Sequence, residues 1–245
     1  MSVFSRLKSL YLVPFVRRIV VRTRLFYFVR VRGRFKAMES PDAFKMTIPH
    51  NLKSLGQCNT RIDLLVKPLS VLETLNKDSK ILIVGPRDEH DIFTLIGHGF
   101  CKEQIRGLDL MSYSPLIDLG DMHGTQYPDG TWDAIIIGWT LSYSSTPRKF
   151  AQEMTRIARN GAVIAIAVEY STMSEQEQVE LTGYSIQETA KLSRRINNVK
   201  DILDLFSSNV DQVFFTHDAP MKRSHEKGGL VRNVSNVAAI FSLRK

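Results

Sequence analysis

The hydrophobic pattern changes at residue 80, after which short apolar runs alternate with longer amphipathic segments. Uninterrupted apolar runs of this length are typical of strands that are covered on both faces of a sheet. Their alternation with helical segments predicts an α/β fold with a doubly wound, mostly parallel sheet. The predicted strands are Ile81–Val84, Ile105–Leu110, Leu116–Leu119, Trp132–Gly138 and Ala162–Val168, followed by two closing strands at Val213–Thr216 and Val237–Ser242.

Helix signals fall between these strands. A short helix around Asp91–Ile96 places its apolar residues on one face. Thr146 and Pro147 predict the start of another, with the threonine hydroxyl as N-cap and proline at the first position, and Asn160-Gly161 predicts its end. Residues 172–208 are expected to be helical and polar, and the basic segment Met221–Gly229 to be a loop.

Charge and the hydrophobic pattern together divide the chain into three parts. Residues 1–36 contain ten Lys and Arg and no acidic residue, whereas the remaining residues carry 23 basic and 25 acidic side chains. We therefore predict a basic amphipathic N-terminal arm over 1–36, a helical lead-in over 37–79 and the α/β domain over 80–245. The arm is expected to be an attachment outside the core.

The arm interleaves large apolar residues with its arginines, and no stretch of it is long and uncharged enough to span a membrane. Such a helix suits an anionic membrane surface, and Phe4, Leu7, Leu10, Tyr11, Phe15 and Ile19 are the expected apolar contacts. Packing on the protein's own core or on a second subunit is an alternative, and nucleic acid is a less favoured partner. A mitochondrial presequence has a similar composition, whereas a secretory signal does not.

The chain has two cysteines, Cys58 and Cys101, without a CxxC motif or a nearby histidine pair. This spacing argues against a disulfide framework and a structural zinc site, and no metal is expected. We expect a protein of a reducing compartment such as the cytoplasm, with peripheral membrane contact through the arm. The oligomeric state is left open.

Two strand ends carry the candidate chemistry. The first strand ends at Gly85, and 24 residues later the second ends at Asp109. A glycine turn followed by an acid at the tip of the next strand is how a doubly wound sheet holds a nucleoside, because the acid accepts hydrogen bonds from the ribose hydroxyls. We therefore expect a nucleoside cofactor.

Further motifs follow in a fixed order: Gly120-Asp121-Met122-His123, then Pro128-Asp129-Gly130-Thr131-Trp132-Asp133, an apolar strand, and Tyr143-Ser144. With the glycine turn and Asp109, this order resembles the class I S-adenosylmethionine-dependent methyltransferases of the small-molecule type over about residues 80–170. The resemblance implies a Rossmann-like seven-stranded sheet with an antiparallel last strand. It also implies a methyl transfer to a small-molecule, saccharide or lipid-linked acceptor.

The resemblance assigns roles to individual residues. Gly85, Pro86, Arg87 and Glu89 would lie near the methionine part of S-adenosylmethionine, and Gly138 and Trp139 would line the same side. Asp109 and Leu110 would border the ribose, and Asp121 and Met122 the adenine. His123 and Tyr143 are the candidate catalytic residues, with adenine-side packing as the alternative for His123; Arg87 and Glu89 are also candidates for a local ion pair.

One departure from the family pattern affects these expectations. The family has alternating glycines where this chain has Gly85-Pro86-Arg87-Asp88-Glu89, so a bulky side chain stands where backbone would approach the ligand. A non-catalytic binding module at a membrane surface is therefore an alternative. A dinucleotide-dependent oxidoreductase is disfavoured because no GxGxxG follows the first strand.

Overall fold

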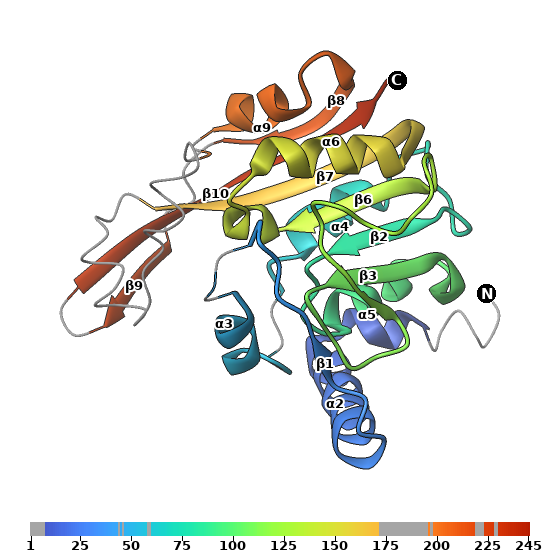
Figure 1. The fold of residues 1–245 in the computed structure, drawn as a ribbon, viewed down its shortest axis with the longest axis vertical. Coiled ribbons are helices and arrows are strands. Elements are labelled where there is room, and N and C mark those ends of the chain that lie inside the picture. Colours follow the sequence, from blue (N-terminus) through green and yellow to red (C-terminus); the bar gives the residue numbers. More distant parts are fainter. Residues whose placement is uncertain are drawn as a thin grey trace.

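A twisted sheet forms the centre of the molecule (Figure 1). The computed structural model describes residues 8–43, 45, 47–57, 60–171, 196, 198–218, 223–227 and 230–245. Seven strands follow the order β5-β3-β2-β6-β7-β10-β8, and β9 pairs with β10. The first five are parallel to one another, whereas β10 runs antiparallel to β7 and β8. Their bounds are β2 Ile81–Val84, β3 Ile105–Asp109, β5 Ile117–Leu119, β6 Trp132–Gly138, β7 Ala158–Ser171, β8 Val210–His217, β9 Arg223–Lys227 and β10 Leu230–Leu243. The predicted doubly wound, mostly parallel sheet is confirmed.

The strand register brings the candidate residues to one edge. Val84, the last residue of β2, pairs with Leu108 on one side and with Ile137 on the other. The residues that follow Val84, Leu108 and Ile137 are Gly85, Asp109 and Gly138, and these three therefore lie at the same edge of the sheet. After β2, the chain adds β3 and β5 on one side of this strand and then β6 and β7 on the other. The carboxyl ends of β2, β3 and β6 therefore form the topological switch point of the sheet.

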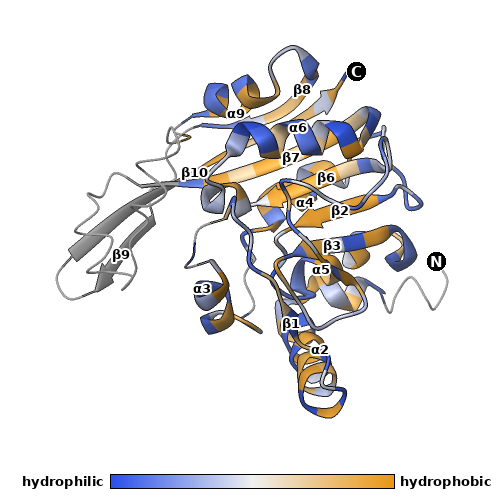
Figure 2. Cartoon of the chain, viewed as in Figure 1, coloured by the Kyte–Doolittle hydropathy of each residue, from blue (hydrophilic) through white to orange (hydrophobic). Residues whose placement is uncertain are grey.

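Alternate side chains of each strand serve opposite layers of helices, as a pleated strand requires. Ile81 and Ile83 belong to a core cluster with α4 and α5. Leu82 and Val84 belong to a second cluster with α6 and α9. Figure 2 shows the resulting hydrophobic strands enclosed between the helices. The helices are α3 Thr47–Lys53, α4 Asp63–Leu69, α5 His90–Gly97, α6 Pro147–Ile157 and α9 Val199–Phe206, with short 3-10 turns η3 Lys102–Gln104, η4 Thr140–Tyr143 and η5 Ser207–Asn209.

Two details of α6 differ from the prediction. The helix begins at Pro147, but the Thr146 side chain makes no capping hydrogen bond. Instead, Ser144 Oγ accepts the Thr146 backbone N–H at 3.1 Å. The helix ends at Ile157, because β7 begins at Ala158; Gly161, with φ of 80°, lies within that strand and does not close the helix.

The C-terminal part also differs from expectation. The segment expected to be a basic loop contains β9, which pairs with Leu230–Val234 of β10. Both closing strands are longer than predicted. Of the predicted polar helices over 172–208, α9 is described, whereas 172–195 and 197 lie outside the described residues.

The N-terminal arm consists of the 3-10 turn η1 (Leu10–Leu12), α2 (Pro14–Phe26) and the π-helical η2 (Tyr27–Val31). After it, β1 (Lys36–Ala37) pairs with β4 (Met111–Ser112). Phe4 and Leu7 lie outside the described residues. Among the residues that the structure describes, no helix is long and apolar enough to cross a bilayer.

The described part of the arm packs against the domain, which corrects the expectation that it lies outside the core. Val21 is buried in the cluster shared with α4 and α5. The Tyr11 ring lies 4.8 Å from that of Phe93 on α5, so Tyr11 is not an outward-facing residue. Gly97 also matters here, because a Cβ at this position would come within 3.0 Å of Leu12 Cδ2. The boundaries at residues 36 and 79 remain predictions.

Candidate functional site

A cavity lies at the carboxyl edge of β2, β3 and β6, at the switch point of the sheet. All but one of the residues assigned from the sequence line it. They are Gly85, Pro86, Arg87, Asp109, Leu110, Asp121, Met122, His123, Gly138, Trp139 and Tyr143. Glu89 is the exception. The remaining wall comes from the lead-in and from the start of α5.

The loop after β2 keeps the shape of a glycine turn despite its altered sequence. Gly85 has φ of 70°, and a Cβ there would overlap the Thr140 side chain. Arg87 has φ of 60°, a left-handed conformation that is unfavourable for a residue with a side chain. Pro86 packs over Gly107, where a Cβ would lie 2.7 Å from the proline Cγ. Thus the arginine adopts the backbone conformation of a glycine, and a glycine on the next strand makes room for the proline.

Asp109 connects this loop to the end of β3. Its Oδ2 accepts the Arg87 backbone N–H at 2.9 Å, and its Oδ1 accepts that of Met111 at 3.1 Å. Burial raises the pKa of Asp109 to about 6, although these backbone hydrogen bonds oppose the rise. The carboxylate retains accepting capacity for a further donor in the cavity.

Glu89 does not face the cavity. It is 0% exposed, and its Oε2 and Oε1 accept hydrogen bonds from Arg24 Nε and Nη2 at 2.5 and 2.7 Å. The Ser114 hydroxyl donates to the same carboxylate. Glu89 therefore pairs with the arm, and neither the local pair with Arg87 nor the contact with a cofactor is supported.

His123 is held at both ring nitrogens. Nδ1 lies 2.6 Å from Asp121 Oδ1, and Nε2 lies 2.7 Å from the Ser144 hydroxyl. Because a carboxylate only accepts, Nδ1 donates, and Nε2 of a neutral ring accepts the hydroxyl hydrogen. No ring nitrogen remains for a substrate, so the geometry argues against a general base. Burial alone would raise the pKa of Asp121, but hydrogen bonds from His123 and Ser40 outweigh it and lower the pKa to about 2.

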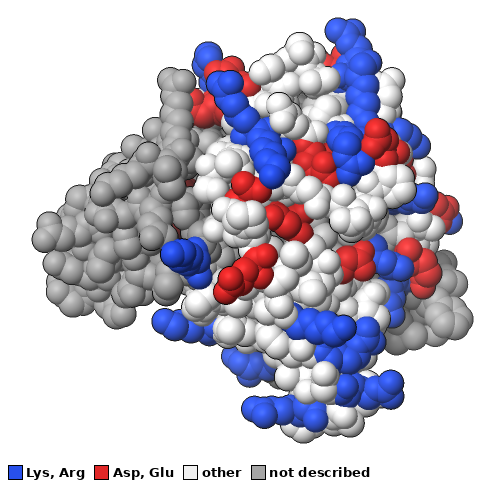
Figure 3. Space-filling model, viewed as in Figure 1, with Lys and Arg blue, Asp and Glu red and all other residues white. Residues whose placement is uncertain are grey.

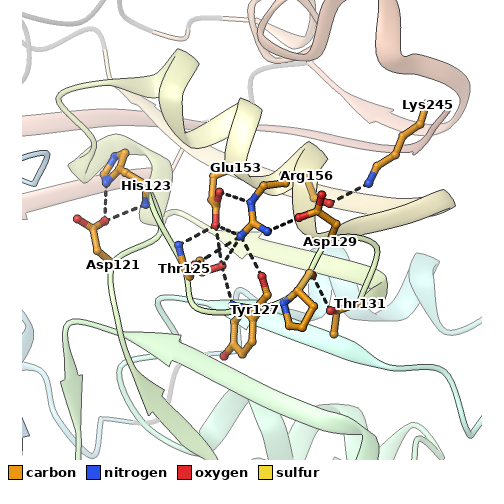
Figure 4. A network of polar contacts seen from close by, with 10 residues as sticks. Asp121, His123, Thr125, Tyr127, Asp129, Thr131, Glu153, Arg156 and Lys245 are labelled. Atoms are coloured by element: carbon orange, nitrogen blue, oxygen red, sulfur yellow. Dashed lines mark hydrogen bonds and ion pairs between the residues drawn. The ribbon is translucent and has the colours of Figure 1, made fainter.

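Arg156 fixes the loop that carries Asp121 and His123 (Figure 4). Its guanidinium donates to Asp129, to Glu153 and to the Tyr127 carbonyl at 2.5–2.9 Å. Glu153 in turn accepts the backbone N–H and hydroxyl of Thr125, both at 2.7 Å. The segment from Thr125 to Asp129 is thereby tied to α6.

Several acidic and basic groups of the cavity were not singled out from the sequence. Burial raises the pKa of Asp91 to about 7, with a contribution from Asp88, whose own pKa burial raises to about 6. Asp88 accepts the backbone N–H groups of Gly56 and His90 at 3.0 and 2.9 Å. The position of Asp88 and Asp91, in and just after the glycine turn, could have marked them as cavity residues. No pattern in the sequence marked Arg61.

The segment that follows β6 adds two aromatic residues, Trp139 and Tyr143, to the cavity wall. The Arg61 guanidinium lies 4.5 Å from the centre of the Trp139 ring, and the Trp139 indole N–H donates to Asn236 at 3.3 Å. The rings of Tyr143 and His50 of α3 are 5.9 Å apart. Tyr143 also lines the cavity.

Asp42, Asp121 and His123 bring potential ligand atoms within 4.8 Å of one another. These atoms already have partners, because Lys149 Nζ lies 2.7 Å from Asp42 Oδ2 and the His123 ring donates to Asp121. The cluster is therefore explained by its own polar contacts.

Comparisons with known proteins agree with this geometry. The family profile described as a methyltransferase domain matches residues 99–166. Curated proteins give no significant match to the sequence.

Several solved structures have a fold similar to that of this chain. A candidate methyltransferase of Bacillus halodurans C-125 is 10% identical with a TM-score of 0.53, and the match covers 74% of this chain and 98% of that one. The methyltransferase in a complex with the Trm112 activator of Haloferax volcanii is 13% identical with a TM-score of 0.53, covering 80% and 93%. The YcgJ protein of Bacillus subtilis is 10% identical with a TM-score of 0.50, covering 75% and 97%.

The strand order with its antiparallel β10, the cavity at the switch point and the matched domain agree with one another. Together they show a Rossmann-like fold shared with solved methyltransferase structures, with residues 99–166 similar to the methyltransferase domain profile.

Proposed function

We propose that this chain transfers the methyl group of S-adenosylmethionine to a small-molecule acceptor that binds in the same cavity. The observation that carries the proposal is Asp109, a buried carboxylate at the tip of β3 that lines the cavity and retains accepting capacity. Because ribose hydroxyls are donors, such a carboxylate suits the nucleoside part of the cofactor.

The other groups of the cavity match the rest of the cofactor. S-adenosylmethionine carries a sulfonium cation, an amino group and a carboxylate. Asp91 supplies negative charge, and Arg87 lines the same wall. The buried Arg87 Nε has no hydrogen-bond partner among the described residues, so it can donate to a carboxylate. Met122 and Leu110 offer apolar surface to the adenine.

S-adenosylmethionine held by these residues would supply an electrophilic methyl group to the acceptor's nucleophile, with a thioether as the leaving group. The protein mainly has to align the two reactants and exclude water. We assign Tyr143 to the acceptor side, where its hydroxyl can orient a nucleophile through a hydrogen bond. We assign His123 to positioning Asp121, because both of its ring nitrogens are already bonded.

The acceptor would contact the part of the cavity wall that the cofactor does not occupy. A small polar molecule suits the mixed wall of Arg61, Asn51 and Tyr143. Saccharide or lipid-linked acceptors follow only if the chain works at a membrane. No specific observation favours a non-catalytic module or a dinucleotide-dependent oxidoreductase.

The experiment compares the chain with Asp109→Ala. We expect the wild type to convert S-adenosylmethionine to S-adenosylhomocysteine when it is supplied with a fractionated small-molecule extract. The variant should bind S-adenosylhomocysteine more weakly by roughly 1.5–3 kcal/mol, the range for a hydrogen bond to a charged group.

The matched control is Asp133→Asn. Asp133 lies at the opposite edge of the sheet, where it accepts the Lys80 N–H at 2.8 Å and pairs with Arg159. Its substitution should leave affinity for S-adenosylhomocysteine unchanged. Unaltered affinity in a folded Asp109→Ala protein would refute the ribose assignment.

A further inference from the structure

The helix α2 exposes large apolar side chains on the side away from the domain and buries an arginine on the side that faces it. Phe15 and Phe26 are 70% and 64% exposed, whereas Arg17 is 1% exposed. Arg24 also faces the domain, where it pairs with Glu89. A surface helix normally buries its apolar residues and exposes its charges. The phenylalanines of α2 are therefore available to something other than this domain.

Phe15, Ile19 and Phe26 form what we call the outer face of α2. Their spacing of four and seven residues places them within about 40° of one another around a helix with 3.6 residues per turn. Ile19 is 49% exposed, and Leu12 and Val13 extend the apolar surface toward the N-terminus.

Basic residues surround this outer face. Arg18 and Arg22 are exposed on the same helix, Arg30 is exposed on η2, and Arg32 and Arg34 follow η2. The first acidic residue of the chain is Glu39. Figure 3 shows this end of the molecule covered by basic and uncharged atoms, without an acidic side chain on the face in view.

We propose that the outer face of α2 docks on the surface of an anionic lipid bilayer, with the helix axis in the plane of the interface. The phenylalanines enter the boundary between headgroups and acyl chains, and the arginines stay at the level of the lipid phosphates. This inference rests on the exposed residues of α2 and is independent of the proposed methyl transfer.

Charge and hydrophobicity together favour this occupant over two others. A second copy seated symmetrically on the same face would bring two sets of arginines together, and like charges repel. A nucleic acid would contact the arginines but would leave exposed phenylalanines unused, since its affinity comes mainly from phosphate contacts.

The test measures co-sedimentation of the 245-residue chain with vesicles of two parts phosphatidylcholine and one part phosphatidylserine. We expect binding that is much weaker with phosphatidylcholine alone, and that high salt reduces only in part. The variant Phe15→Ser with Phe26→Ser should lower the partition coefficient by at least about tenfold, because it removes the apolar part of the contact. The variant Arg18→Glu with Arg30→Glu should lower the salt-sensitive part.

The matched control is Val71→Ser, since Val71 is 77% exposed and lies outside α2. All variants should keep the wild-type melting temperature. Several outcomes would overturn the proposal: no binding to the anionic vesicles, equal binding by the double phenylalanine variant, tighter binding to RNA that added salt abolishes, or a doubled mass in solution that the phenylalanine substitutions remove.

Discussion

Arg87 is the residue at which this chain departs most from the alternating glycines of the methyltransferases that it resembles. A left-handed backbone costs a residue with a Cβ about 1–2 kcal/mol, and Arg87 has φ of 60°. The conformation persists because its backbone N–H donates to Asp109. The side chain then lies in the cavity wall with a buried nitrogen that a ligand carboxylate can satisfy.

Asp91 leads to a prediction about pH. Its pKa in the folded chain is about 7, raised mainly by burial from 3.8. The folded chain therefore binds a proton at Asp91 more tightly than the unfolded chain does. The contribution of this proton to the free energy of unfolding is lost as the pH rises from about 4 to 7. We expect Asp91→Asn to unfold like the wild type at pH 4.5 and to be more stable by at least about 1 kcal/mol at pH 8. Urea unfolding at both pH values measures this difference.

The comparison of two proteins at each pH cancels the contributions of other groups. These include His50 and His98, whose pKa values burial lowers, and Asp121, whose pKa is about 2. A substitution that destabilises the chain equally at both pH values would show that Asp91 is ionised and satisfied throughout.

Sequence reasoning brought together residues that lie at strand ends, and their roles toward a cofactor stay predictions. Asp109 and Asp121 follow apolar runs, and both line the cavity. It was wrong about Glu89, because the partner, Arg24, is 65 residues away. It also could not show that Ser144 would occupy the second nitrogen of His123.

At the scale of elements, the strands were predictable because residues such as Ile135 and Ile136 are buried on opposite faces of one strand. The end of α6 was not, because pairing of Ala158 with Trp132 starts β7 before the Asn160-Gly161 signal is reached. The arm was misjudged for a similar reason. Its charges suggested solvent exposure, yet two of its arginines, Arg17 and Arg24, face the domain.

The contact between α2 and the loop after β2 is open to a direct test. Replacing Arg24 by Ala leaves the fully buried Glu89 without its main partner, and breaking such pairs is strongly destabilising. We expect a loss of about 2–4 kcal/mol in unfolding free energy, somewhat less than for a fully buried pair because Arg24 is 27% exposed. Urea denaturation provides the measurement.

Arg18→Ala is the control, since Arg18 is an exposed arginine on the same helix. It should change the unfolding free energy by no more than about 0.5 kcal/mol. If the two variants were equally stable, α2 would not be anchored through Glu89, and the arm would be closer to the detached attachment that its charge suggested.

At the scale of the whole molecule, the fold places two different surfaces on one chain. The cavity lies at the switch point, where the carboxyl ends of β2, β3 and β6 meet. The basic and apolar outer face lies on α2, which packs on α5. The strand order follows from the alternation of apolar runs and helices, whereas the composition of the cavity depends on contacts between the lead-in and the sheet that no local pattern encodes.

The most direct test of the cofactor site is calorimetric titration of the full chain with S-adenosylhomocysteine and, separately, with NAD. We predict saturable one-to-one binding of S-adenosylhomocysteine and none of NAD. The affinity should fall as the pH is lowered through about 6, because protonation of Asp109 removes the carboxylate that accepts the ribose hydroxyls. Binding of NAD in its place, or no binding of S-adenosylhomocysteine or S-adenosylmethionine by the folded chain, would contradict the assignment of this cavity.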